Sequence, residues 1–173
     1  MGMMAGTNLY TLCEGDPLNF VDVFGLCDAN FISKGDDARE GAEIIPSGGS
    51  QFTVATHGGA GGNGLFAKAG TPISAQQLID GINADGHKPG QPILMATCYG
   101  GVGQNLDVMK QVAAAEHSDV IAATKEVFPR ANGKKGAYVF VDLLVKDKAG
   151  PGAWVDISPN GTVSPYAGPI CGK

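Results

Sequence analysis

Two short apolar runs decide the fold of this 173-residue chain: QFTVATHGG at residues 51–59 and PILMATCYGG at residues 92–101. Each run has the length and the aliphatic or β-branched character of a buried strand, and each is followed by glycines. Between them, residues 74–84 place apolar side chains at the i, i+3, i+4 and i+7 spacing of an amphipathic helix. Ser74, with Gln77 three residues later, predicts a capped start for this helix. A strand, a helix and a second strand predict parallel strands joined by a crossover helix.

The same alternation continues toward the C-terminus. Residues 105–117 have the spacing of a second helix, and residues 119–123 have the character of a third strand. Residues 137–146 and 154–157 are expected to be strands of a hairpin or meander. The sequence therefore predicts an α/β domain whose mostly parallel central sheet is flanked by helices.

Both strands of the first unit end in residues that can carry chemistry. His57 follows the first strand and Cys98 follows the second. The carboxyl ends of neighbouring parallel strands lie about 4.8 Å apart at one edge of a sheet, and ligands of such sheets bind beyond that edge. We therefore expect the two side chains to lie close enough to act on one substrate carbonyl.

A cysteine and a histidine placed in this way suggest nucleophilic catalysis. A thiol is a poor nucleophile, and a nearby imidazole supports the thiolate form that attacks carbonyl carbon. The glycines after His57 permit close backbone approach, so that the N–H of Gly58 can point at a developing oxyanion. These residues predict a Cys98 nucleophile, a His57 acid–base group and a Gly58 backbone donor. The alternative is an inert, buried cysteine that behaves as a small hydrophobe.

The order of these features resembles that of the caspase-like cysteine peptidases, which include caspases, gingipains, the self-cleaving domains of large bacterial toxins and CHAT proteins. The resemblance covers roughly residues 51–125 and consists of an apolar strand, His-Gly, one helix, a second apolar strand and Cys. It implies a three-layer sandwich fold, endopeptidase activity and the same roles for His57, Cys98 and Gly58. Thr97 stands where the family usually has alanine, and no residues of a specificity pocket can be identified from the sequence.

The N-terminal segment resembles the end of the core of Rhs and YD-repeat proteins. The matching residues are Asn8-Leu9-Tyr10, Asp16-Pro17, Asn19 and Asp22-Val23-Phe24-Gly25-Leu26, with Val23 in place of the usual proline. In that family the core forms a cage that cuts itself after this leucine and releases a variable C-terminal toxin. The resemblance therefore implies a processing junction between Leu26 and Cys27.

Three segments follow from this division. Residues 1–26 are interpreted as the end of an Rhs core, and residues 27–50 as a polar lead-in with a short strand at 43–45. Residues 51–173 are expected to form the caspase-like α/β domain.

Composition excludes several classes of function. The net charge of −5 does not suit a protein that neutralises nucleic-acid phosphates with a basic face. No apolar run approaches the length of a membrane span, and the first residues lack the pattern of a secretory signal. The cysteines and histidines lack the spacing of metal ligands, so neither a metal nor a cofactor is predicted. Residues 59–64 match a dinucleotide-binding glycine pattern, but no helix opens directly after them, and we expect a mobile loop there.

Two classes of function remain. The first is a cysteine peptidase toxin that an Rhs-type protein delivers into the cytoplasm of a target cell, where it cleaves proteins. The resemblance implies the parent cage and a cognate immunity protein as its partners. The second is a non-catalytic α/β module that plugs the cage or docks a partner, and a toxin of another enzymatic class also stays open. His87 lies in a predicted turn and is expected to be exposed to solvent.

Overall fold

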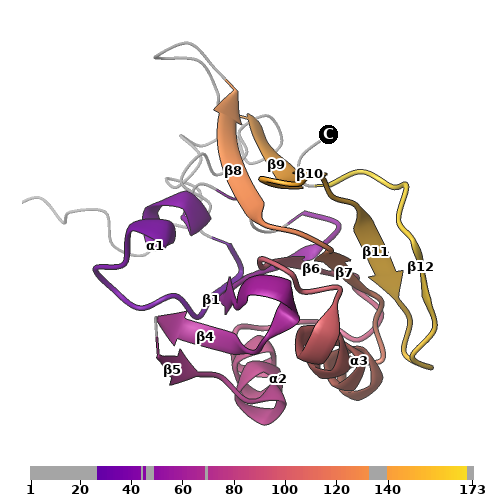
Figure 1. The fold of residues 1–173 in the computed structure, drawn as a ribbon. Coiled ribbons are helices and arrows are strands. Elements are labelled where there is room, and N and C mark those ends of the chain that lie inside the picture. Colours follow the sequence, from indigo (N-terminus) through magenta and orange to yellow (C-terminus); the bar gives the residue numbers. More distant parts are fainter. Residues whose placement is uncertain (1–26, 44, 46–48, 69, 133–139, 171–173) are drawn as a thin grey trace, which may run out of the picture.

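A six-stranded sheet forms the centre of the computed structural model, which describes residues 27–43, 45, 49–68, 70–132 and 140–170 (Figure 1). In order across the sheet the strands are β1 (Ala29–Asn30), β2 (Phe52–Ala55), β6 (Ile93–Ala96), β7 (Val120–Ala123), β11 (Trp154–Ile157) and β12 (Val163–Pro165). The strands expected near residues 51, 92, 119 and 154 are therefore confirmed.

Most strands of this sheet point in one direction. β1, β2, β6 and β7 pair in parallel, whereas β11 runs antiparallel to both of its neighbours, β7 and β12. Among the six strands, β11 alone is therefore reversed. The sheet is mixed, and the α/β class expected from the sequence is confirmed.

Two helices cover one face of the sheet. α2 (Ala75–Ala84) connects β2 to β6, and α3 (Gly103–Glu116) connects β6 to β7. Because β2, β6 and β7 are successive neighbours, right-handed crossovers place both helices on the same side. The hydroxyl of Ser74 accepts the N–H of Gln77, and the Gln77 side chain accepts the N–H of Ser74, so the predicted cap is confirmed. α3 ends where His117 adopts a left-handed conformation, with φ at 51°.

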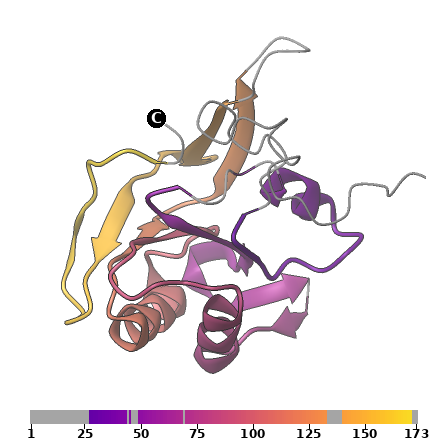
Figure 2. The ribbon, with the colours of Figure 1, turned by 180° about the vertical axis from the view of Figure 1, so that it is seen from behind.

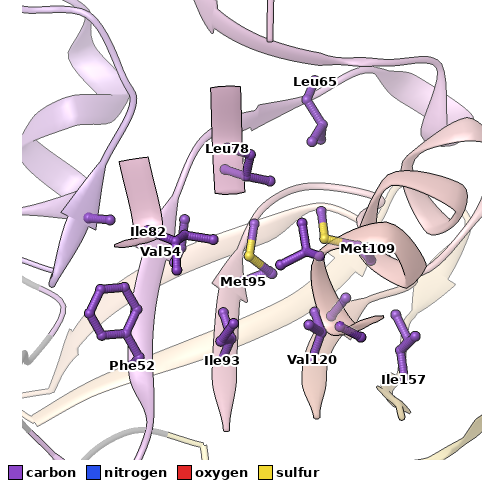
Figure 3. Packing of buried hydrophobic residues seen from close by; sticks show 14 residues of the cluster. Phe52, Val54, Leu65, Leu78, Ile82, Ile93, Met95, Met109, Val120 and Ile157 are labelled. Carbon is purple, nitrogen blue, oxygen red and sulfur yellow. The ribbon is translucent and has the colours of Figure 1, made fainter. Parts of the chain in front are cut away.

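The main apolar core lies between these helices and the sheet. Alternate residues of the strands point toward α2 and α3 because side chains along a strand face opposite sides in turn. The core includes Phe52, Val54, Leu65, Leu78, Ile82, Ile93, Met95, Met109, Val120 and Ile157 (Figure 3). Every one of these side chains is almost completely shielded from water. The helical spacing of residues 74–84 therefore points Leu78 and Ile82 into this core.

The opposite face has a different cover (Figure 2). It consists of the short helix α1 (Asp37–Ala42) and a hairpin of β8 (Val127–Asn132) and β9 (Phe140–Asp147), to which β10 (Gly150–Pro151) adds a short third strand. A second apolar cluster, with Ile32, Leu94, Ile121 and Leu143 among its members, lies beneath this cover. The longer helices thus lie on one face only, and a hairpin takes much of the other face. The strand expected at 137–146 corresponds to β9, although residues 137–139 lie outside the described residues.

The polar lead-in contributes directly to the domain. β1 pairs in parallel with β2 and forms one edge of the sheet. Asp36 caps α1 by accepting the N–H of Ala38 at 3.0 Å. The strand expected at 43–45 is wrong, because Glu43 ends α1 in a helical conformation and Ile45 is buried in the second cluster; Ile44 lies outside the described residues.

The glycine-rich segment after β2 forms a small sheet of its own. It contains β3 (His57–Gly58), the 3₁₀ turn η2 (Ala60–Gly62), β4 (Leu65–Lys68) and β5 (Thr71–Pro72). Residues 59–64 therefore form the turn of a hairpin, where a mobile loop was expected from the sequence. Gly62 has φ at 81° and packs so closely on the start of α3 that a Cβ would lie 2.1 Å from the carbonyl oxygen of Val102.

Candidate active site

The pairing of β2 with β6 brings the two reactive residues to one edge of the sheet. Ala55 lies opposite Ala96, so His57 and Cys98 each stand two residues beyond a matched pair. The expectation that both emerge at the carboxyl edge is therefore confirmed. The two backbones stay in close contact beyond the strand ends, since a Cβ on Gly58 would lie 1.6 Å from the carbonyl oxygen of Cys98. Only glycine fits this approach, and it holds the two segments together.

His57 is oriented by a carboxylate from the lead-in. Its Nε2 lies 3.0 Å from Oδ2 of Asp36, and both side chains are partly exposed. The other carboxylate oxygen of Asp36 accepts the N–H of Ala38 at the start of α1. These two hydrogen bonds, the one from Ala38 first, lower the pKa of Asp36 below its ordinary value of 3.8, so the carboxylate is charged at neutral pH. Asp36 thus fixes the imidazole through Nε2 and leaves Nδ1 available.

Asp36 is the member of this site that was not predicted from the sequence. Its nearest signal is the pair Asp36-Asp37 ahead of a short run of helix-forming residues, because aspartate is a favoured N-cap. That signal predicts the start of a helix. It does not predict a bond to His57, which lies 21 residues farther along the chain.

Cys98 faces a different group. Its Sγ accepts the backbone N–H of Val127, at the start of β8, at 3.3 Å. Burial raises the pKa of the Cys98 thiol above its ordinary value of 9.0; the N–H of Val127 opposes this rise, and the carboxylate of Glu126 adds to it. Within the described residues, no hydrogen bond joins Cys98 to His57. In this conformation the cysteine is therefore a protonated thiol.

The residue after Cys98 has an unusual backbone conformation. Tyr99 has φ at 53°, in the left-handed region that side chains other than those of glycine, asparagine and aspartate rarely enter. Its N–H donates to the carbonyl of Lys125 at 2.8 Å, and its carbonyl accepts the side-chain amide of Asn105 at 3.2 Å. These bonds hold the turn in place against its strain, and strained turns of this kind are concentrated at functional sites.

Gly58 is placed so that it can serve as a backbone donor. The N–H of Gly59 donates to the carbonyl of Gly64 at 2.8 Å. Hydrogen-bonding residues alternate along an antiparallel pair, so the N–H of Gly58 points away from β4. Gly58 also contacts the backbone of Cys98, as described above.

A cavity of about 390 Å³ adjoins both reactive residues. His57 and Cys98 form part of its wall, and α1 with the residues around it forms the opposite wall. This volume lies within the range of about 300–1,000 Å³ that is typical of small-molecule sites. The cavity gives a substrate a place to bind next to the thiol.

Cys27, one side of the expected processing junction, is not among the described residues that line this cavity. It is 4% exposed, its thiol donates to the carbonyl of Ala29 at 3.5 Å, and burial raises its pKa to about 12. It precedes β1 and therefore belongs to the amino end of the sheet. Leu26, the other side of the junction, lies outside the described residues.

The expectation for His87 is wrong. The side chain is buried, with Nδ1 at 2.9 Å from Oε2 of Glu116 and Nε2 at 2.9 Å from the carbonyl of Gln91. Its ring also meets Phe52 edge-on, with 5.2 Å between the ring centroids. The turn at residues 85–90 folds back onto the end of α3. Because the residues of this turn are mostly polar, their contact with α3 could not be predicted from the sequence. His87 is therefore a structural residue of the core.

Two further properties concern the described part of the chain as a whole. It contains no cluster of histidine, cysteine, aspartate or glutamate side chains that could hold a metal ion. None of its helices combines the length and the apolar character that crossing a bilayer requires.

The chain belongs to a family described as a domain of unknown function (DUF8616), whose model matches residues 27–137. No curated protein matches the chain, and no solved structure matches it either. The matched region begins at Cys27, so it includes the lead-in with Asp36 as well as His57 and Cys98. The lead-in and the two strand ends therefore belong to one family domain.

Proposed function

We propose that this domain is a cysteine hydrolase of the caspase-like kind that cleaves peptide bonds with Cys98 and His57. The observation that carries the proposal is the register of β2 and β6, which puts these two residues at the carboxyl edge of adjacent parallel strands, beside one cavity. Catalytic residues of α/β proteins gather at this edge. Asp36 adds a third polar group to the site. Its carboxylate contacts the imidazole of His57 and orients it, as the third group of a catalytic triad orients the base.

The proposed reaction follows the two steps of covalent catalysis. His57 accepts the thiol proton of Cys98 while the sulfur bonds to the carbonyl carbon, and the oxyanion is stabilised by the N–H of Gly58. The C–N bond then breaks, and the leaving nitrogen takes the proton from His57. His57 next removes a proton from water, which attacks the thioester, and Cys98 leaves as the C–S bond breaks and regains its proton.

This reaction requires the thiol to turn from Val127 toward His57. In the present conformation the sulfur is bonded to the N–H of Val127, and burial keeps its pKa high. A rotation about the side-chain bond of Cys98 exchanges this partner for the imidazole. We propose that a bound substrate favours the second position, because catalytic hydrogen bonds often tighten only in the substrate complex.

The wider setting is proposed from residues 1–26, which resemble the end of an Rhs core. We propose that the domain is an effector released at Leu26–Cys27 from a parent cage, and that it acts on proteins in the cytoplasm of a target cell. A cognate immunity protein is the partner expected of such an effector. The net charge of −5 supports a protein target over a nucleic acid.

Growth of bacteria that express the 173-residue chain tests the proposed activity. We expect wild type to arrest growth and Cys98→Ala to permit it, because the nucleophile is lost at little cost in volume. Cys27→Ala makes the same change at a thiol away from the site and is the matched control. Equal arrest by wild type and Cys98→Ala, at equal protein levels, contradicts the proposal.

A non-catalytic binding module is the second candidate, and the bond from Val127 to the Cys98 sulfur favours it. Alkylation by iodoacetamide at pH 6, followed by peptide mass spectrometry on the folded chain, separates the two candidates. If the domain is a peptidase, the Cys98 thiol should turn to His57 in a fraction of the molecules even without substrate. Cys98 should then react faster than Cys27, whose pKa is about 12, and His57→Ala should slow Cys98 alone. A Cys98 that reacts only in denaturant favours the binding module.

A further inference from the structure

The cavity beside Cys98 has a strongly apolar interior. Its innermost wall is made by Ile32, Ala42 and Ile45, which are between 2% and 5% exposed. These three residues come from α1 and the segments next to it, so the lead-in supplies the wall opposite the catalytic edge. Ala96 and Val127 line the side toward the strands. An occupant of this space is surrounded mainly by carbon atoms.

Charged groups are few and lie at the rim. Asp37 is the one carboxylate in the lining that the structure describes, and it is exposed at the first position of α1. Phe128, which is 43% exposed, lies at the rim as well. Apart from His57, no basic side chain lines the cavity within the described residues. An acidic side chain bound here finds no Lys or Arg among the described lining residues to pair with, and it meets the field of Asp37 on entering.

The hydroxyl of Thr56 and Nε2 of His57 are already engaged, and Nδ1 of His57 is the atom proposed to accept the thiol proton of Cys98. The hydroxyl of Thr56 donates to the carbonyl of Phe66 at 3.0 Å, and the imidazole of His57 is held by Asp36. A buried ammonium or carboxylate without a partner is costly, whereas an apolar side chain gains from leaving water. The chemistry of the wall therefore selects an uncharged occupant.

We infer that this cavity binds an apolar side chain, of the size of leucine, methionine or phenylalanine, on the residue whose carbonyl group Cys98 attacks. This inference rests on the proposed peptidase function and names its substrate class. The side chain of that residue stays beside Cys98 in both steps, because its carbonyl carbon is bonded to the sulfur in the acyl-enzyme. The lead-in is then the element that determines specificity.

Cleavage of a peptide mixture tests the inference even though no individual substrate is identified. The 173-residue chain is incubated with two digests of a bacterial lysate, one made with trypsin and one with a protease that cuts after glutamate, so that every residue type occurs inside the peptides of at least one digest. New termini are identified by mass spectrometry. We expect leucine, methionine or phenylalanine before most new cuts. Aspartate or glutamate, or lysine or arginine, at that position overturns the inference and leaves the peptidase function standing. A cut pattern identical to that of Cys98→Ala overturns the peptidase function and the inference with it.

Variants that fill the cavity test whether its wall determines the preference for an apolar side chain. Ala42→Leu takes space at the inner end, and Ala38→Leu takes it from the exposed side of α1, where the fold tolerates a larger residue. With a leucine-containing peptide from the mixture, we expect either variant to lower kcat/KM about tenfold or more, while a peptide with alanine at that position keeps its rate. Ala84→Leu, at an exposed position of α2, is the matched control and should change neither rate. Equal losses for both peptides in a folded Ala38→Leu variant overturn the assignment of this cavity.

Discussion

The two faces of the central sheet differ in how they are closed. On one face, α2 and α3 pack against the strands, and fourteen of the described residues, all almost fully buried, form a continuous apolar core. On the other face, α1 and the β8–β9 hairpin cover a cluster to which eight of the described residues belong, and they leave a cavity of about 390 Å³ beside Cys98. Close packing gives stability, whereas an open space next to reactive groups gives a place to bind. We therefore assign most of the stability to the helical face and the chemistry to the hairpin face.

Substitutions of His57 and His87 should give the largest difference in activity and stability between the two faces. His57→Ala should lower peptide cleavage by at least about 10,000-fold and leave the urea midpoint nearly unchanged. His87→Ala should cost about 3 kcal/mol in the free energy of unfolding, because buried Glu116 loses one of its two side-chain partners and keeps only the amide of Asn83. Cleavage per folded molecule should stay normal in His87→Ala. A folded His57→Ala variant with normal activity breaks the comparison.

Leucine-to-alanine changes compare the packing of the faces directly. Leu78→Ala, on α2, should lower the free energy of unfolding by about 2–5 kcal/mol, since its side chain is fully enclosed. Leu143→Ala, on β9, should cost less, because this side chain belongs to the cluster on the hairpin face and is 8% exposed. Urea unfolding of the two variants measures both. A larger loss for Leu143→Ala reverses the assignment of stability.

The helical face is also the part of the fold that the sequence predicts best. The spacing of Leu78 and Ile82 depends on contacts within one helix, and the strands at 52–55 and 93–96 are short apolar runs. The lead-in could not be predicted in this way. β1 has two residues and α1 six, and each owes its place to tertiary contacts, β1 to its pairing with β2 and α1 to the apolar cluster below it.

The candidate site divides along the same line. His57 and Cys98 were predictable because strand order and direction fix which residues meet at a sheet edge. Asp36 was not predictable. Its bond to His57 joins two segments that are distant in the sequence, and no local sequence pattern indicates that they lie close together. The prediction for His87 failed for a related reason: its partner Glu116 lies 29 residues away on α3.

Asp36→Asn sharpens the comparison within the site. Asparagine is as good an N-cap as aspartate, so α1 should remain folded, while the charge that supports a protonated His57 is lost. We expect kcat to fall on the order of tenfold with KM little changed. Asp107→Asn, at an exposed position of α3, is the control and should have no effect. A rate equal to that of wild type limits Asp36 to its role as a helix cap.

Wild type and Asp36→Asn should also show a smaller, pH-dependent difference in stability. The folded-state pKa of Asp36 lies below its ordinary value of 3.8, so the charged carboxylate stabilises the fold above that pH. This contribution is lost as the pH falls through the lower, folded-state pKa. We expect wild type to be more stable than Asp36→Asn at pH 6, and the gap to shrink below pH 3.8. Urea titrations at several pH values measure it, and a gap that grows on acidification contradicts the assignment.

The position of β1 bears on the proposed release of the domain. Ala29 pairs in parallel with Val54, which stands three residues before His57. At about 3.3 Å per residue, the start of β1 is therefore roughly 10 Å from the level of the reactive edge, and Cys27 precedes it along the chain. We accordingly assign the proposed cut before Cys27 to an agent other than Cys98. A Cys98→Ala domain should then be liberated from its parent as readily as wild type, and its maturation would carry no information about its potency.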